Sequence, residues 1–138
     1  MVTPFNQSDG NLNEAALRKL TNHLIDGGVH GLFVVGSQGE FWALTADEKK
    51  RAFETVLDET NGRVPVYAGT GGITTKEVVA LTQLAESAGI DCVSVLSPFF
   101  LKPTEEDLYI HYRDVAASTK LPVPHSSSNW RKEASTTC

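Results

Sequence analysis

Three glycine-rich or proline-flanked loops hold the residues best suited to chemistry in this chain of 138 residues. The first is Gly36-Ser37-Gln38-Gly39-Glu40, where glycines allow a sharp turn that exposes backbone N–H groups and Ser37 adds a hydroxyl. Such donors would hold a small carboxylate or a phosphate. The sequence matches neither the dinucleotide-binding glycine pattern nor the P-loop. On spacing alone, a tight strand-to-helix turn without a ligand stays open as the alternative.

The other two loops are weaker candidates. Gly69-Thr70-Gly71-Gly72 has the same donors, but its simpler role is to turn the chain ahead of a helix. The loop at residues 97–103 places Phe99 and Phe100 beside the same face. Glu40 is a candidate base or loop-orienting residue, although a carboxylate in a turn more commonly hydrogen-bonds backbone N–H groups.

No metal site and no cofactor are expected. The four histidines lack metal-ligand spacing with carboxylates or thiols, so we interpret them as solvated or helix-end residues: His23, His30, His111 and His125. The two cysteines, Cys92 and Cys138, fit reduced thiols of a cytoplasmic protein better than a disulfide.

Composition removes several classes of function. The formal net charge is -5, and no run of Lys or Arg suggests nucleic-acid binding. No apolar stretch approaches the roughly 20 residues that span a bilayer. The first five residues lack the basic and apolar regions of a signal peptide. We therefore expect a cytoplasmic protein without nucleic-acid or membrane partners.

Alternating strand and helix patterns must position these loops. Amphipathic helices are predicted at residues 13–26, from Thr45 to the Asn61-Gly62 stop, from Thr74 to the Gly89 stop, and from Thr104 onward. Three of them begin with a capping-box pattern, at Thr45, Thr74 and Thr104. Strands are predicted at residues 1–4, 32–35, 64–68 and 92–96, with a fifth opening at 121–123. The short apolar run at 32–35 suits a strand covered on both faces.

Four strand-helix units in series predict an α/β protein with a parallel sheet, right-handed crossovers and ligands at the carboxyl ends of the strands. An open doubly wound sheet and a closed barrel both satisfy this pattern. The pattern ends after Val123. We expect residues 1–123 to form the folded unit and residues 124–138 to be a disordered tail.

In this order the loops resemble the dihydrodipicolinate synthase and N-acetylneuraminate lyase family. The resemblance covers about residues 1–123 and rests on several motifs: Thr3-Pro4-Phe5, Gly36-Ser37-Gln38-Gly39-Glu40, Leu44-Thr45-Ala46-Asp47-Glu48, residues 63–71, Pro98-Phe99-Phe100-Leu101-Lys102-Pro103, residues 108–112 and Leu121-Pro122-Val123. It implies the first half of a TIM (β/α)₈ barrel, usually tetrameric. Such proteins capture pyruvate or a related 2-oxo acid as a Schiff base on a lysine.

The resemblance also implies roles for individual residues. Ser37 and Gln38 take the positions that bind the substrate carboxylate, within the turn made by Gly36 and Gly39. Further residues are expected to line the site: Thr3, Pro4, Glu40, Gly69 and Phe100. The synthase branch usually has Thr at the position of Gln38 and Tyr at that of Phe100. Because Phe has no hydroxyl to pass a proton, an aldolase or sugar-acid dehydratase branch fits better.

The end of the chain departs from the family pattern. Pro124 and His125 follow Val123, where the family has a tyrosine, and the Schiff-base lysine is expected beyond Cys138. Of the lysines present, Lys102 alone is expected at the binding face, on a wet loop, and the others lie on helix surfaces or in the tail: Lys19, Lys49, Lys50, Lys76, Lys120 and Lys132. We predict a fragment that keeps the carboxylate loop, retains no catalytic residue and is inactive alone.

Two alternatives remain. An open half barrel exposes strand edges and an apolar sheet face, which favours a non-catalytic interaction module that pairs with itself or with full-length family subunits. The loop pattern is also compatible with an open α/β nucleotide-binding domain.

Overall fold

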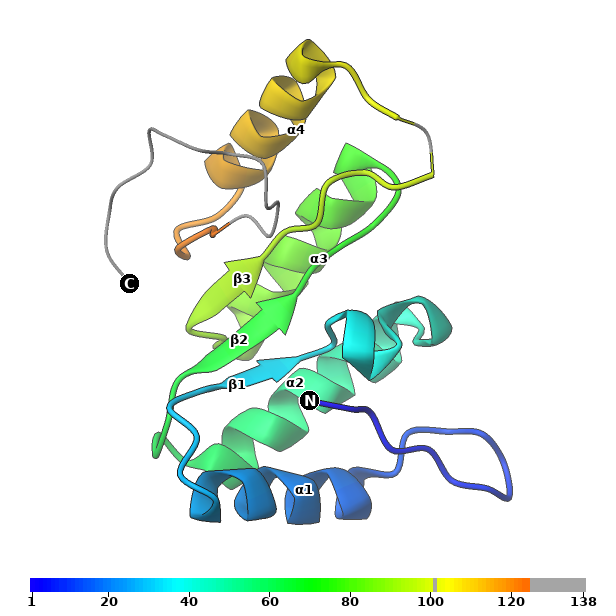
Figure 1. Cartoon of the computed structure of the whole chain (residues 1–138), viewed down its shortest axis with the longest axis vertical. Helices are drawn as coiled ribbons and strands as arrows, with labels where there is room; N and C mark the ends of the chain where they lie inside the picture. Colours follow the sequence, from blue (N-terminus) through cyan, green and yellow to red (C-terminus); the bar gives the residue numbers. More distant parts are fainter. Residues whose placement is uncertain (101, 125–138) are drawn as a thin grey trace.

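The computed structural model describes residues 1–100 and 102–124. Strands and helices alternate along the chain (Figure 1): α1 (Glu14–Asp26), β1 (Leu32–Val34), the 3₁₀ helices η1 (Ser37–Gly39) and η2 (Phe41–Ala43), α2 (Ala46–Thr60), β2 (Val66–Gly69), α3 (Thr75–Ala88), β3 (Cys92–Ser94) and α4 (Glu105–Ala117). The tail predicted to be disordered lies, apart from Pro124, outside the described residues, as does Cys138.

The three strands form one parallel sheet in the order β1-β2-β3, with Val34 opposite Ala68 and Gly69 opposite Ser94. Helix α1 packs on α2, α2 on α3, and α3 on α4. In Figure 1, α2 and α3 lie behind the strands. This is the predicted α/β arrangement, in which each crossover helix returns the chain to the start of the next parallel strand.

The segments predicted as the first and fifth strands are not strands in the described residues. The amino group of Met1 donates to the Phe33 carbonyl (2.7 Å), but the chain then leaves the sheet at Pro4, which has no N–H to donate. On the other edge, Val93 donates to the Pro122 carbonyl (3.1 Å). Each segment therefore lies beside the sheet without a regular ladder.

Threonine caps set the starts of the helices, as predicted. The Thr45 hydroxyl accepts from the Glu48 N–H (3.2 Å), and the Glu48 carboxylate accepts from the Thr45 N–H (2.9 Å). Thr104 heads a full box of the same kind at α4. At α3 the Thr74 hydroxyl caps the helix, but the Glu77 carboxylate accepts from Ile73 instead, so that predicted box is only half formed.

The core fills the space between the sheet and the helices. Phe53, Val56, Ala68 and Val93 are completely buried there. Residues 32–35 were expected to be covered on both faces, but Phe33 is 41% exposed, so that prediction is wrong. Phe33 points away from the helices, to the face of the sheet that the described residues leave open.

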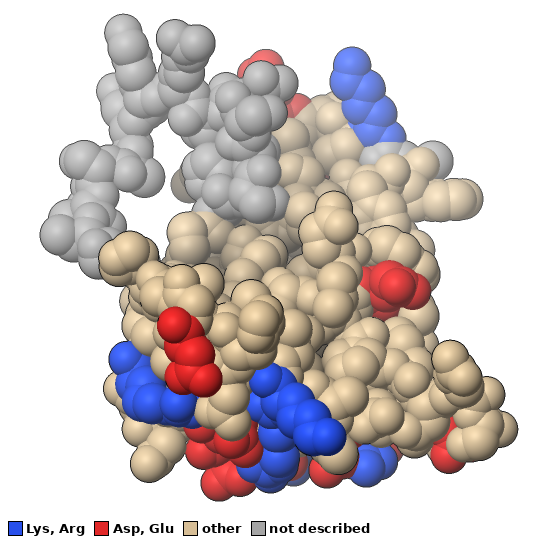
Figure 2. All heavy atoms as spheres, turned by 60° about the horizontal axis from the view of Figure 1, so that its bottom comes forward, with Lys and Arg blue, Asp and Glu red and all other residues tan. Residues whose placement is uncertain are grey.

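The outer face of α1 and α2 carries paired charges. Arg18 bonds Asp58 and Glu59, and Arg51 bonds Glu14. Figure 2 shows acidic and basic side chains mixed on this side of the molecule. These exposed pairs contribute little to stability individually. None of the helices in residues 1–100 and 102–124 has the length and apolar character needed to cross a membrane.

Candidate functional site

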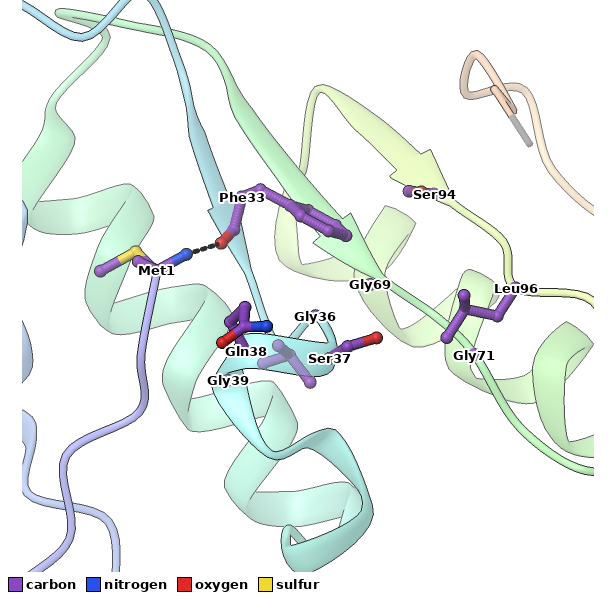
Figure 3. Close-up of a pocket in the computed structure, with 11 residues that line it drawn as sticks. Met1, Phe33, Gly36, Ser37, Gln38, Gly39, Gly69, Gly71, Ser94 and Leu96 are labelled. Atoms are coloured by element: carbon purple, nitrogen blue, oxygen red, sulfur yellow. Dashed lines mark hydrogen bonds between the residues drawn. The ribbon is translucent and has the colours of Figure 1, made fainter. Parts of the chain in front are cut away.

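A cavity of about 210 Å³ lies at the carboxyl ends of the three strands (Figure 3). Its wall joins the loop after β1 to the ends of β2 and β3. The lining residues are Met1, Phe33, Val35, Gly36, Ser37, Gln38, Gly39, Gly69, Gly71, Ser94 and Leu96. This is the edge of a parallel sheet where ligands bind.

One wall is the turn formed by residues 36–39. Gly39 donates to the Gly36 carbonyl (2.9 Å), and Glu40 donates to the Ser37 carbonyl (3.2 Å). The N–H groups of Ser37 and Gln38 begin the 3₁₀ helix η1, where no acceptor inside the helix is available. Both residues are exposed to the cavity, and Figure 3 shows the Ser37 hydroxyl directed toward Gly71 and Leu96. The arrangement therefore offers hydrogen-bond donors to an anion.

Gly69 lets this turn sit directly against β2. A Cβ on Gly69 would lie 2.2 Å from the Val35 carbonyl oxygen, a backbone atom, so that position leaves no room for a side chain. A Cβ on Gly36 would lie 2.6 Å from the ring of Phe33 in β1, which would have to move aside. The close contact between Gly69 and the Val35 carbonyl therefore fixes the position of the turn relative to the sheet.

Non-glycine residues in the left-handed region bracket the turn. Val35 has φ 55° and Glu40 has φ 52°. Such a conformation costs on the order of 1–3 kcal/mol per residue and persists only where its surroundings enforce it. For the β-branched Val35, which is 1% exposed, no sequence signal indicated this conformation.

The structure brings together five of the residues predicted for the site: Gly36, Ser37, Gln38, Gly39 and Gly69 all line the cavity. The other four lie elsewhere. Thr3 is buried against the turn, Pro4 is half-buried, and Glu40 and Phe100 are exposed outside the cavity. Sequence reasoning had not named Val35, Ser94 or Leu96, whose place in the wall depends on strand register.

An aromatic cluster stands beside the cavity rather than in it. The buried Phe41 ring makes edge contacts with Trp42 (5.4 Å between ring centroids) and Phe99 (6.0 Å). Trp42 is 65% exposed and Phe100 is 76% exposed. This part of the surface is therefore unusually apolar.

No described lysine lines the cavity. Lys102 is exposed, as expected for a wet loop. Lys49 was predicted to lie on a helix surface, and that prediction is wrong, because it is 7% exposed with its amine 5.8 Å from the Phe41 ring centroid. Burial lowers the pKa of this amine, partly offset by Glu77. The η2 turn, which folds Phe41 over the start of α2, buries it.

His111 was expected to be solvated or at a helix end, and it is neither. It is 2% exposed, and its Nδ1 lies 2.9 Å from the Thr75 hydroxyl. Burial lowers the pKa of the imidazole. Within the part of the chain that the structure describes, His, Cys, Asp and Glu side chains form no group of three that would hold a metal ion.

Comparison with known proteins identifies relatives over almost the whole described chain. A sequence profile of the dihydrodipicolinate synthetase family matches residues 1–124. The 4-hydroxy-tetrahydrodipicolinate synthase of Desulforudis audaxviator is 48% identical over 123 residues, and that of Bacillus subtilis is 43% identical. These matches cover 89% of this chain but 42% of each relative, so the chain spans less than half the length of the curated relatives it matches.

Solved structures agree with the sequence matches. YagE from E. coli K12, a prophage protein of the dihydrodipicolinic acid synthase family crystallised with pyruvate, superposes with a TM-score of 0.86 at 40% identity. That match covers 90% of this chain and 41% of YagE. Dihydrodipicolinate synthase from Aquifex aeolicus gives 0.86 at 35% identity, covering 91% of this chain and 42% of its own.

Proposed function

The chain belongs to the dihydrodipicolinate synthetase family, with the fold of the N-terminal part of its TIM-barrel members, and on that premise we propose that its 36–39 turn binds the carboxylate of pyruvate or a related 2-oxo acid. The observation that carries the proposal is the pair of N–H groups at Ser37 and Gln38, which begin η1 at the cavity wall. The Ser37 hydroxyl adds a third donor. Hydrogen bonds to a charged acceptor are worth roughly 1.5–3 kcal/mol each.

The lining of the same cavity supports binding of a 2-oxo acid without formation of an imine on a lysine. Imine formation needs a neutral primary amine close to the ketone carbon, and lysines supply it when they are desolvated. The desolvated Lys49 belongs to the aromatic cluster and does not line the cavity. The amine that does line the cavity, that of Met1, donates to the Phe33 carbonyl (2.7 Å). We therefore propose that the 138-residue chain alone holds a 2-oxo acid but captures it on no lysine.

For the whole protein, the residues at two positions favour the aldolase or sugar-acid dehydratase branch. Phe100 offers no hydroxyl to a proton relay, and Gln38 stands where the synthase branch usually has Thr. The curated relatives reported above are synthases, so only an assay of the whole protein separates the branches. Cleavage of a 2-oxo sugar acid by the whole protein would support this proposal, and efficient dihydrodipicolinate-type condensation alone would contradict it.

A titration with pyruvate tests carboxylate binding. In ¹⁵N-labelled protein, the amide signals of Ser37 and Gln38 should shift with pyruvate but not with methyl pyruvate, which is the matched uncharged ligand. Ser37→Ala should weaken the affinity by roughly tenfold to 150-fold, because one donor to a charged group is lost. An equal response to acid and ester would refute the carboxylate site.

Reductive trapping tests the absence of chemistry. Treatment with pyruvate and borohydride should leave every lysine unmodified. Peptide mapping by mass spectrometry separates reaction at a lysine from reaction at the Met1 amine, which lines the cavity. A stoichiometric adduct on any lysine would overturn the proposal.

A second role is favoured by the exposed apolar side chains. Phe33, Trp42 and Phe100 are each more than 40% exposed, and Phe33 belongs to β1 of the sheet. We propose that the chain associates with itself or with full-length family subunits through these residues. Sedimentation equilibrium should show a mass that rises with concentration, and a strict monomer at 100 μM would contradict it.

A further inference from the structure

Thr3 contacts the 36–39 turn at Gly39, a residue of the cavity wall. Its side chain is 8% exposed, and its hydroxyl donates to the Gly39 carbonyl at 2.7 Å. The approach is close, since a Cβ on Gly39 would lie only 3.1 Å from the Thr3 hydroxyl oxygen. Thr3 itself does not line the cavity. Its hydroxyl is therefore bonded to a turn that lines the cavity without lining the cavity itself.

The turn needs such support at one end more than at the other. At the first end, Val35 is held in its left-handed conformation by its buried side chain and by the packing of its carbonyl on Gly69. At the second end, the left-handed Glu40 is exposed, and its carboxylate has no hydrogen bond or ion pair with a described residue. Side-chain packing therefore does not explain the conformation of Glu40.

The backbone bonds around Glu40 are mostly local. Its N–H donates to Ser37, and its carbonyl accepts from the Ala43 N–H (2.8 Å). Both bonds move with the turn if the turn shifts as a unit. The bond from Thr3 to the Gly39 carbonyl comes from 36 residues away and ties this end to a separate segment. It is the contact best placed to resist relaxation of the strained turn.

We propose that Thr3 is a positioning residue for carboxylate binding: through the Gly39 carbonyl, it holds the strained turn so that the N–H groups of Ser37 and Gln38 face the cavity. This inference rests on the proposed function. The ligand is the carboxylate of a small 2-oxo acid, with pyruvate as the probe. Thr3 does not touch the ligand, and its effect is transmitted by backbone geometry alone.

Three variants of the 138-residue chain test the inference. Thr3→Val keeps the shape of the side chain and removes the hydroxyl, and Thr3→Ser keeps the hydroxyl. Thr21→Val is the matched control, because Thr21 is also buried and donates its hydroxyl to a carbonyl, that of Leu17 (2.9 Å), away from the site. The readouts are amide hydrogen exchange over residues 36–40 and the pyruvate dissociation constant from the NMR titration.

We expect Thr3→Val to speed exchange at residues 36–40 and to weaken pyruvate binding by roughly fivefold to tenfold, the effect of one lost hydrogen bond. Thr3→Ser should behave like the wild type. Thr21→Val should lower the unfolding midpoint without a selective effect on the turn. Wild-type exchange and affinity in Thr3→Val would overturn the inference, and so would equal changes in Thr3→Val and Thr21→Val.

Failure of the proposed function is distinguishable from failure of this inference. A wild-type chain that does not bind pyruvate refutes the carboxylate site, while the exchange comparison still decides whether Thr3 holds the turn. If Thr3→Val does not fold, the double variant Thr3→Val/Glu40→Gly replaces it. Glycine adopts positive φ without strain, so this variant should recover the fold and the slow exchange. A double variant as unfolded as Thr3→Val would contradict the inference.

Discussion

Replacing Gly69 by alanine should displace the 36–39 turn, because the structure leaves no space for one additional carbon. The new Cβ would lie 2.2 Å from the Val35 carbonyl oxygen and 3.0 Å from Gly36 Cα, whereas ordinary contact begins near 3.4 Å. The conflict with oxygen exceeds 1 Å and involves backbone, which no side-chain rotation relieves. Overpacking of this kind costs typically 1–3 kcal/mol.

Gly31 supplies the control for this substitution. A Cβ there would meet the Tyr67 ring at 3.0 Å, which a small side-chain movement relieves, and the Pro65 carbonyl oxygen at 3.3 Å, which is close to ordinary contact. Neither glycine has a positive φ, so backbone strain does not separate the two variants. Gly31→Ala should therefore cost under about 1 kcal/mol.

Urea unfolding measures both effects, and the pyruvate titration reports the position of the turn. At roughly 4 °C per kcal/mol, Gly69→Ala should also lower the thermal midpoint by about 4–12 °C. Ser37 and Gln38 amide signals should shift in the free protein, and pyruvate affinity should fall. If Gly69→Ala unfolds within 0.5 kcal/mol of Gly31→Ala, roughly the scatter of ordinary surface substitutions, the packing argument for the turn is refuted.

Two buried ionisable residues give further predictions. Burial lowers the pKa of His111 in the folded chain. Below the ordinary histidine pKa of about 6.5, the unfolded chain therefore binds more protons than the folded chain. The free energy of unfolding should fall as the pH drops through that value. His111→Gln should flatten the pH dependence of the unfolding free energy, measured by urea titration between pH 5 and 8. The same change at the exposed His23 should not flatten it. An unchanged pH dependence in His111→Gln would assign the effect to other groups. Lys49→Met should raise the unfolding midpoint at neutral pH, because it removes a desolvated charge that has no salt bridge with a described residue. The control, Lys50→Met, should leave the midpoint nearly unchanged or lower it slightly, because it removes the exposed ion pair with Glu54. A large loss of stability in Lys49→Met would show that the ammonium, not its methylene chain, supports the fold.

Helix positions were predictable because their signals are local. In each capping box, the side chain of one residue accepts a hydrogen bond from the backbone N–H of the other, three residues away. This holds for Thr45 with Glu48 and for Thr104 with Asp107. Gly89 ends α3 at φ 91°, a conformation that glycine adopts freely. The glycines and donors of the 36–39 turn were predictable for the same reason.

What the sequence did not predict depends on contacts between distant segments. Lys49 lies on an amphipathic helix at a position that looks solvated until η2 folds Phe41 over it. Thr3 was predicted to line the site, yet it is absent from the cavity lining and donates to the Gly39 carbonyl. The left-handed Val35 follows from the fit of its carbonyl against Gly69, on a different strand. None of these contacts can be inferred from the hydrophobic periodicity or the composition of the sequence.

We propose that binding and chemistry are separable in this protein, because different physical requirements govern them. Holding a carboxylate needs oriented N–H donors, and in this proposal Thr3, Val35 and Gly69 orient those donors through contacts within residues 1–69. Capturing the ketone on a lysine needs an unprotonated amine at a defined distance, and the desolvated Lys49 lies against the Phe41 ring and does not line the cavity. A chain that binds pyruvate through Ser37 and Gln38 but resists reductive trapping at every lysine would display the first property without the second. If trapping at Lys49 and binding at Ser37 were instead lost together in Ser37→Ala, the two functions would share one site and this separation would be wrong.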